Sequence, residues 1–305
     1  MSLLNTLAEL KLYVSIDTTQ GIPPAIEMAM REVEDTTIAL VLGPALYAWL
    51  QAQYDAPDFS PTADTLAGEL LRLVQRPIAR LGTAAGLPEH QVSIDGTGIH
   101  IMTTETSKTA FPWQVNQLRN KLEGRGQSDL DTLVQWLEDN YQSSAELQAW
   151  AASEAGRRHR RELFTSTAAF QEYENIGDSR AVFQRLGPVR RRQEAFELGR
   201  VLGAAFLQEL REQVRDRALT SDNQNLLRTY VLPALAALTV GHATSEMGLK
   251  FTGDGIELMV ARTDDSNAKE ADAGLDQLLA NKTHEALATG ARYLSQLTSY
   301  LDRTA

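Results

Sequence analysis

Apolar residues at helical spacing recur along most of the chain. Leu46, Trp49 and Leu50 occupy positions i, i+3 and i+4, which fall on one face of a helix. A helix is also expected after Pro23, because prolines are tolerated in a first turn. Gly82 is the predicted stop of a longer helix. In chain order, the first predicted helix opens at Pro23-Pro24 and the second begins near Pro44. The others run over residues 65–81, 113–122, 130–138, 145–152, 271–280 and 285–301.

Two short segments change to an alternation of apolar and polar residues, which is typical of β-strands. The first, residues 92–101, has Gly96-Thr97 at its centre, and the second, residues 249–260, has Gly253-Asp254-Gly255. Glycine and small polar residues at such a centre favour a tight turn between antiparallel strands. The sequence therefore predicts one hairpin near residues 91–103 and another near residues 248–261.

Three motifs occur twice, in the same order and at nearly constant spacing. The pairs are Leu70-Leu71-Arg72 with Leu226-Leu227-Arg228 at an offset of 156 residues, Val41-Leu42-Gly43 with Val201-Leu202-Gly203 at 160, and Gly98-Ile99 with Gly255-Ile256 at 157. Ordered repetition at a fixed period indicates two copies of one structural unit of ordinary domain size. The predicted fold is mainly α: a tandem duplication of a helical-bundle unit, residues 1–155 and 156–305, with one short β-hairpin in each copy.

Composition agrees with a well-packed globular protein. The chain has 305 residues, of which 43% are apolar and 23% charged, and this length suits about two domains. It has no cysteine, which excludes disulfides and thiolate metal sites. The longest apolar stretch, residues 231–240, is about half of the roughly 20 residues that a membrane span requires. The first residues lack the features of a secretory signal, so we expect a cytoplasmic protein or part of a particle assembled in the cytoplasm.

The net charge of -11 argues against free nucleic-acid binding, because phosphate contacts need clustered basic residues. The charge is uneven, however, and residues 157–192 hold 9 arginines against 4 acidic residues. This stretch is either a solvated face or a surface for an acidic partner. The candidate partner-binding arginines are Arg157, Arg158, Arg160, Arg161, Arg190, Arg191 and Arg192.

All four tryptophans, Trp49, Trp113, Trp136 and Trp150, lie in the first half of the chain. The two copies therefore cannot have identical cores or identical contact surfaces. Burial in the core is the usual outcome for tryptophan, and we expect it for most of the four. Trp113 follows Phe111-Pro112 at a predicted helix start, and it is the candidate for a partner interface, where large aromatic residues are enriched.

No pattern of catalytic, cofactor-binding or metal-binding residues stands out. Gly96-Thr97-Gly98 lacks the third glycine of a phosphate-binding loop and falls inside a predicted hairpin. His100 alternates with two isoleucines, which places it on the solvent face of a strand. One segment has the spacing of acidic and polar residues found loosely in calcium-binding loops: Asp264, Ser266, Glu270 and Asp272. It has Lys269 at the position where such a loop requires glycine. We therefore expect no cofactor and no enzymatic activity.

Three segments in a fixed order define a wider pattern. They are Ile38 to Leu50, then Ile94 to Arg119, with Asp95, Gly98-Ile99, Glu105, Lys108-Thr109-Ala110 and Trp113-Gln114, and then Trp150, Ser153 and Phe170. The pattern resembles an uncharacterised family encoded in phage and prophage gene clusters, which is similar to the head-to-tail connector (adaptor) proteins of tailed phages. The resemblance implies a helical subunit of a ring beneath the portal, in a virion or a bacterial cytoplasm. Its implied partners are further copies of the chain and portal or tail proteins, with no specific nucleic-acid recognition and no membrane.

Residues and resemblance together favour a non-enzymatic ring subunit. A ring needs two unlike, complementary flanks on each subunit, and two diverged copies supply unlike surfaces. Two alternatives stay open: a soluble helical adaptor that binds a protein partner without forming a ring, and an enzyme whose carboxylates converge only in three dimensions. A monomer at high concentration would favour the adaptor. A deep pocket with several perturbed acids would favour the enzyme.

Overall fold

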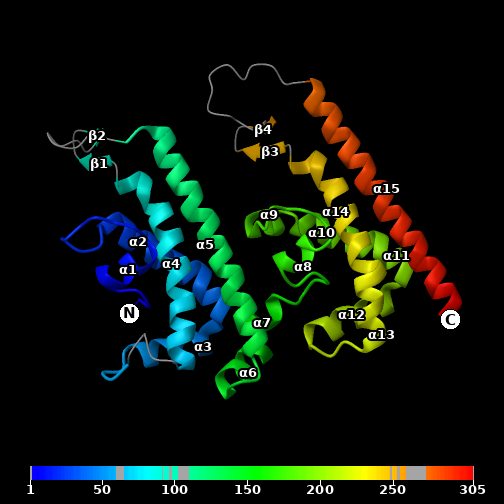
Figure 1. Cartoon of the computed structure of the whole chain (residues 1–305), viewed down its shortest axis with the longest axis horizontal. Coiled ribbons are helices and arrows are strands. Elements are labelled where there is room, and N and C mark those ends of the chain that lie inside the picture. The colour runs from blue at the N-terminus through cyan, green and yellow to red at the C-terminus, as the bar shows by residue number, and fades with distance from the viewer. Residues whose placement is uncertain are drawn as a thin grey trace. The chain divides into compact units, whose positions relative to one another are not determined.

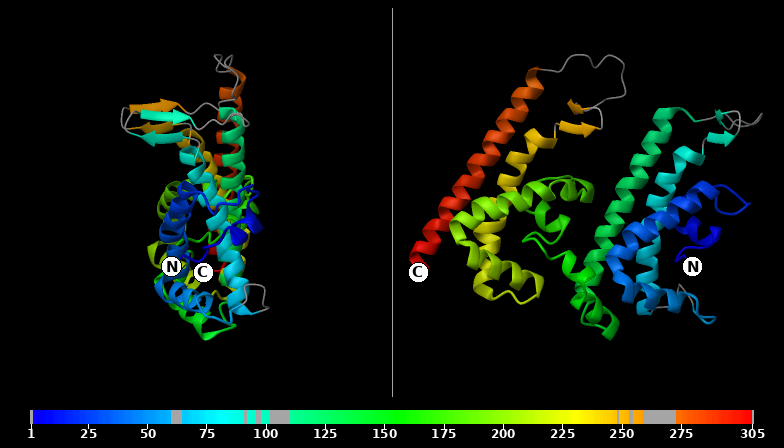
Figure 2. Two further views of the ribbon diagram at one scale, coloured as in Figure 1. Left: turned by 90° about the vertical axis from the view of Figure 1, so that its left-hand side faces the viewer. Right: turned by 180° about the vertical axis from the view of Figure 1, so that it is seen from behind.

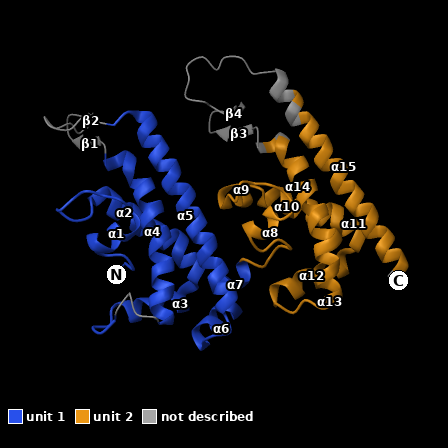
Figure 3. Ribbon diagram, in the orientation of Figure 1, with its two compact units in different colours: residues 1–158 blue, residues 159–305 orange. Residues whose placement is uncertain are grey.

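The computed structural model describes residues 2–59, 65–90, 92–95, 98–101, 110–247, 249–252, 255–258 and 273–304. These residues are mainly α-helical, as predicted (Figure 1). The chain divides into unit 1, Met1–Arg158, and unit 2, His159–Ala305 (Figure 3). The division falls at the end of helix α7 (Glu154–Arg158), whereas the predicted boundary after residue 155 lies inside that helix.

Unit 1 is built around α4 (Leu66–His90), which packs against α2 (Pro24–Val33) and α5 (Pro112–Asn140). Helix α2 begins at Pro24, within the Pro23-Pro24 pair at which a helix was predicted to open. The remaining helical elements are α1 (Leu7–Tyr13), the π-helical turn η1 (Glu34–Ile38), α3 (Ala39–Tyr54), α6 (Ala145–Ala152) and α7. Helix α6 spans the residues predicted for it.

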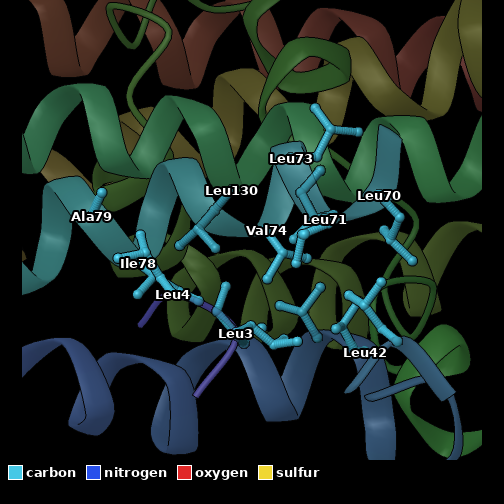
Figure 4. Close-up of a cluster of buried hydrophobic side chains, with 14 of the residues drawn as sticks. Leu3, Leu4, Leu42, Leu70, Leu71, Leu73, Val74, Ile78, Ala79 and Leu130 are labelled. Carbon is cyan, nitrogen blue, oxygen red and sulfur yellow. The ribbon is translucent and has the colours of Figure 1, made fainter. Parts of the chain in front are cut away.

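The core of unit 1 forms where α4 meets the N-terminal segment and α3. Leu70, Leu71 and Ile78 of α4 are fully buried, and Leu3 and Leu4 are buried with them (Figure 4). Burying a leucine or isoleucine side chain contributes about 1.5–3 kcal/mol each, so this cluster supplies much of the unit's stability.

The predicted stop of α4 at Gly82 is wrong, because the helix continues to His90. Gly82 is instead a point of close approach between α4 and α2. A Cβ atom there would lie 2.3 Å from Cγ of Met30. The glycine therefore permits the packing of two helices and does not end one.

The two helices predicted over 113–122 and 130–138 are one continuous helix, α5. Gly126 lies between the two predicted segments. It faces α4, where a Cβ atom would lie 2.6 Å from Cγ and Cδ2 of Leu81. Close approach to a neighbouring helix again accounts for the glycine.

A helix was predicted to begin near Pro44, but α3 begins at Ala39. The helix kinks at Gly43, whose φ of 69° and ψ of 165° are not helical. Pro44 follows the kink, where its missing N–H costs no regular helical hydrogen bond. The prediction therefore located the kink and missed the helical turn before it.

In unit 2, two long helices, α14 (Leu232–Met247) and α15 (Ala273–Thr304), pack along each other in an antiparallel arrangement (Figure 2). The helices predicted over 271–280 and 285–301 fall on α15 from residue 273 onward, and residues 271–272 lie outside the described residues. The other helical elements are α8 (Thr167–Gln171), α9 (Arg180–Arg185), α10 (Gly187–Gln193), η2 (Glu194–Leu198), α11 (Gly199–Leu202), α12 (Ala204–Arg215), α13 (Ser221–Leu226) and η3 (Leu227–Val231). Its own buried cluster includes Phe170, Leu210, Val231, Leu235 and Leu297.

Two pairs of short strands accompany the helices. Strand β1 (Val92–Asp95) pairs antiparallel with β2 (Gly98–Ile101), with Asp95 opposite Gly98. Strand β3 (Leu249–Thr252) pairs antiparallel with β4 (Gly255–Leu258), with Thr252 opposite Gly255. Both pairs therefore share one register.

One helical stretch of the described residues, Ser221–Thr244, is long and apolar enough to be considered as a membrane span. Of its most apolar 18-residue window, 67% is buried inside the protein. It contains the buried residues Val231 and Leu235 of the unit 2 core. This stretch is a core helix, which agrees with the expectation for residues 231–240.

Candidate partner-binding surfaces

The candidate arginines do not form a single exposed cluster. Arg157 and Arg158 belong to the last turn of α7 in unit 1, and the other five belong to unit 2. Arg157, Arg158 and Arg161 are exposed, and Arg160 is half-buried. Arg160 donates a hydrogen bond of 3.0 Å from Nη1 to the main-chain carbonyl of Val214. It therefore contributes to the packing of unit 2.

Arg190 is a buried structural residue, and its selection as a partner-binding residue is wrong. Its side chain is only 4% exposed. The guanidinium pairs with Glu162 through Nε and Nη2 at 2.8 and 2.7 Å, and Nη1 donates to the Phe183 carbonyl at 2.6 Å. Its Cζ also lies 3.8 Å from the centroid of the Phe183 ring, a cation–π contact. These interactions compensate the positive charge of the buried Arg190 guanidinium within unit 2.

The two following arginines are at the surface. Arg191 pairs with the other oxygen of Glu162 at 2.8 Å, and its side chain is 60% exposed. Arg192 pairs with Glu246, and both of these side chains are about half exposed. Surface pairs of this kind contribute at most about 1 kcal/mol and can exchange partners. Arg191 and Arg192 therefore remain available to a partner, whereas Arg190 does not.

Trp113 is 53% exposed in the first turn of α5. Phe111, which precedes this helix, is 64% exposed, and Leu118 in the second turn is 47% exposed. Exposed aromatic residues grouped in this way are typical of interfaces. The role of Trp113 in partner binding stays a prediction.

The other three tryptophans pack in unit 1, as expected. Trp150 is 2% exposed, and its Nε1 donates to the Val41 carbonyl at 2.9 Å. Trp49 and Trp136 are partly buried against the core. Trp136 also donates from Nε1 to Glu69 at 2.9 Å.

Two buried glutamates in the π-helical turns were missed by the sequence analysis. Glu34 opens η1 and accepts hydrogen bonds from the Leu3 N–H at 2.8 Å, the Tyr47 hydroxyl at 2.7 Å and the Ser2 hydroxyl. Burial and this hydrogen bond raise the pKa of the Tyr47 phenol. The carboxylate thus fastens the N-terminal segment to the helical core of unit 1.

Glu194 plays a similar part in unit 2. It opens η2, its side chain is 1% exposed, and it accepts from the Leu163 N–H and from Nε of Arg211. Burial raises the pKa of the Glu194 carboxyl, and the Arg211 hydrogen bond opposes this shift only partly. Glu34 and Glu194 stand 160 residues apart, the offset of the Val-Leu-Gly motif, so the repeat itself was the signal that could have found them.

Two open cavities lie at the described surface. One, of about 430 Å³, is lined by Ser2, Asn5, Arg31, Glu34, Asp35 and Tyr47. The other, of about 590 Å³, is a groove in unit 2 lined by Glu197, Arg200, Val201, Leu238, His242, Ala291, Leu294, Ser295 and Thr298. Among the described residues, no three His, Asp or Glu side chains converge as a metal site would require. The side chain of His100 and the segment with Asp264, Ser266, Glu270 and Asp272 lie outside the described residues.

The molecule is thus a mainly helical protein of two units, each with its own core and a carboxylate fastened in a π-helical turn. Residues 38–160 and 198–305 match the model of a family of unknown function, DUF6712. The chain belongs to this family. The two matched segments begin 160 residues apart. No curated protein and no solved structure matches the chain.

Proposed function

We propose that the two units are tandem copies of one helical unit, each with one hairpin. At an offset of 160 residues, Glu34 and Glu194 open the π-helical turns, and Leu3 and Leu163 donate their N–H groups to these carboxylates. The glycines that end the following helical turn, Gly43 and Gly203, both have positive φ, 69° and 79°. The two units therefore share the sequence offset, the backbone conformation at the glycine and the hydrogen bond to the glutamate, as two copies of one unit would.

The second halves of the units support the same correspondence. Gly126 of α5 and Gly290 of α15 are each a contact point with the helix beside it. A Cβ atom at Gly126 would lie 2.6 Å from Cγ of Leu81, and one at Gly290 would lie 2.6 Å from Cγ of Leu238. In both units the strand pair follows this partner helix, with one register. The same glycine–leucine contact between two helices in both units is expected if the units are copies of one another.

The proposed function is that of a non-enzymatic structural protein, a ring subunit of a phage head-to-tail connector. The observation that supports this function is that the two units share one arrangement of helices but expose different residues at corresponding positions. Leu40 in unit 1 is 51% exposed, and Arg200 stands at the corresponding position of unit 2. Phe196 of unit 2 is 68% exposed, and Thr36 corresponds to it. Unlike flanks permit a heterologous contact, which closes a ring when it is repeated around an axis.

The charge of the chain suits such a ring. A net charge of -11 gives a subunit that repels DNA phosphates, so DNA could pass through the ring without adhering to it.

The protein partners would be further copies of the chain, with portal or tail proteins above and below. The proposed location is therefore a virion or the cytoplasm of a bacterium.

Mass measurement tests the proposal. The purified chain is examined by light scattering and by electron microscopy of negatively stained particles, alone and mixed with a candidate portal protein. We expect closed rings in at least one of the two samples. A monomer in both, up to high concentration, would contradict ring assembly and favour a soluble helical adaptor.

A further inference from the structure

In unit 1, helices α6 and α7 cover the kinked part of α3. Trp150 of α6 is buried and donates its indole N–H to the Val41 carbonyl at 2.9 Å. Ala155 of α7 lies against Gly43, where a Cβ atom would fall 2.8 Å from the alanine Cβ. The segment α6–α7 thus supplies one aromatic donor and one small residue to this surface.

The surface beneath α6–α7 is apolar and closed to solvent. Val41, Leu46 and Val134 are between 2% and 5% exposed, and Leu137 is fully buried. These residues come from α3 and α5. They form the surface on which Trp150 and its neighbours pack in unit 1.

The corresponding surface of unit 2 is open. Val201, Phe206 and Leu301 are only half-buried, and Thr298 is exposed. A Cβ atom built on Gly203 would meet no heavy atom within 4 Å, in contrast with Gly43. Within the part of unit 2 that the structure describes, no helices take the place of α6 and α7.

The 590 Å³ groove of unit 2 lies at this uncovered surface. Three of its lining residues, Val201, Leu294 and Thr298, correspond to Val41, Leu130 and Val134 of unit 1. Leu238 and Ala291 add apolar surface to the groove. Glu197 and Arg200 line it as well and pair with each other at 3.0 Å. The groove is therefore lined by both apolar and polar side chains.

We propose that this groove binds a short helical segment of a separate partner protein, with the chemistry of α6–α7. A tryptophan of that segment would fill the groove and donate its indole N–H to the Val201 carbonyl. A small residue of the segment would pack against Gly203. The proposal rests on the correspondence of the two units and is independent of ring assembly.

The occupant comes from another protein because the chain's own α6–α7 is already in use. Trp150 is 2% exposed and its indole N–H is bonded within unit 1. Moving the segment to another unit 2 would expose Val41, Val134 and Leu137, which are buried in unit 1, and this loss of apolar burial opposes the exchange. A partner with a similar segment binds without this loss.

A synthetic peptide of residues 141–158, carrying a fluorophore, is the probe. Its binding to the full-length protein is followed by fluorescence anisotropy at high protein concentration, because an isolated helix of this length is marginal in water. We expect binding, and we expect a Trp150→Ala peptide to bind at least about tenfold more weakly, as for a buried aromatic anchor. Absence of binding by the natural peptide, or equal binding by both peptides, would overturn the proposal.

Two substitutions on α15 localise the peptide. Ser295 is exposed and lines the groove, so Ser295→Arg should weaken peptide binding at least about tenfold. Gln296 is exposed on the same helix and does not line the groove, so Gln296→Arg should change binding less than about twofold. Equal effects of the two substitutions would place the peptide elsewhere and refute the site.

Light scattering of the same variants separates this proposal from the proposed function. Ser295→Arg is expected to leave the oligomeric mass unchanged. A lower mass would show that a second copy of the chain fills the groove, which would refute a separate partner. Peptide binding by a chain that never forms a ring would contradict the connector and leave the groove proposal standing.

Discussion

A single arginine fastens three parts of unit 2 to one another. Arg190 of α10 pairs with Glu162, which precedes α8, and bonds the carbonyl and the ring of Phe183 in α9. A buried charge is tolerated only when partners replace its hydration, and here three groups do so. The residue therefore acts in folding, although its sequence neighbours are surface arginines.

Arg190→Ala should lower the free energy of unfolding by about 3 kcal/mol, because it leaves Glu162 and the Phe183 carbonyl without their buried partner. Arg191→Ala is the matched control, since its pair with Glu162 is at the surface, and it should cost less than about 1 kcal/mol. Urea denaturation of both variants measures the difference. Similar losses would mean that burial does not distinguish the two arginines.

Glu194 gives stability a pH dependence of known sign. The folded-state pKa is raised above the ordinary value of 4.5 by burial. Its contribution to stability is therefore fully present below about pH 4.5 and is lost as the pH rises through the folded-state pKa. We expect the stability of the natural protein relative to Glu194→Gln to fall as the pH rises from about 4.5 through the folded-state pKa. Urea titrations across this range measure it, and parallel curves for the two proteins would disprove the assignment.

At the scale of elements, glycines set how closely the helices of unit 1 pack. Gly126 of α5 touches Leu81, while Gly124, two residues earlier, has no neighbour within 4 Å of a built Cβ atom. The two residues share a helix and differ in what they face. An added methyl group at Gly124 therefore changes helix propensity alone, whereas at Gly126 propensity and packing act in opposite directions.

Gly124→Ala should stabilise the protein by about 0.5–1 kcal/mol, because alanine favours the helix. Gly126→Ala gains the same propensity but forces Leu81 aside, and overpacking costs about 1–3 kcal/mol, so a net loss is expected. Thermal unfolding monitored by circular dichroism compares the pair. Stabilisation by both substitutions would show that α4 and α5 separate easily.

The sequence predicted the helical class and several helix starts, but it misjudged glycines and charges for one physical reason. Gly82 has the local pattern of a helix end, and only the neighbouring helix reveals that it is a contact point. The burial of Arg190 depends on Glu162, which is 28 residues away. Such effects depend on tertiary packing, which local periodicity does not report. The start at Pro24 was predictable because it is set by the proline itself.

At the scale of the whole molecule, Trp113 is the exposed aromatic residue that we propose takes part in assembly. Trp113→Ser should lower the oligomeric mass or the affinity for a portal protein, and it should leave the unfolding midpoint nearly unchanged because the side chain is 53% exposed. Leu12→Ser is the control, since Leu12 is an exposed apolar residue of α1. Light scattering and thermal unfolding measure both properties. Equal effects of the two substitutions would remove any special role for Trp113.

The distribution of tryptophan gives the two units different optical properties. All four tryptophans, Trp49, Trp113, Trp136 and Trp150, fall within unit 1, so intrinsic indole emission reports on that unit alone. Far-ultraviolet dichroism, by contrast, sums the helices of both units. When the two signals are recorded on one sample during denaturation, they coincide if the halves melt together and separate if they melt one after the other. The natural chain thus carries its own spectroscopic label for measuring how strongly its halves are coupled.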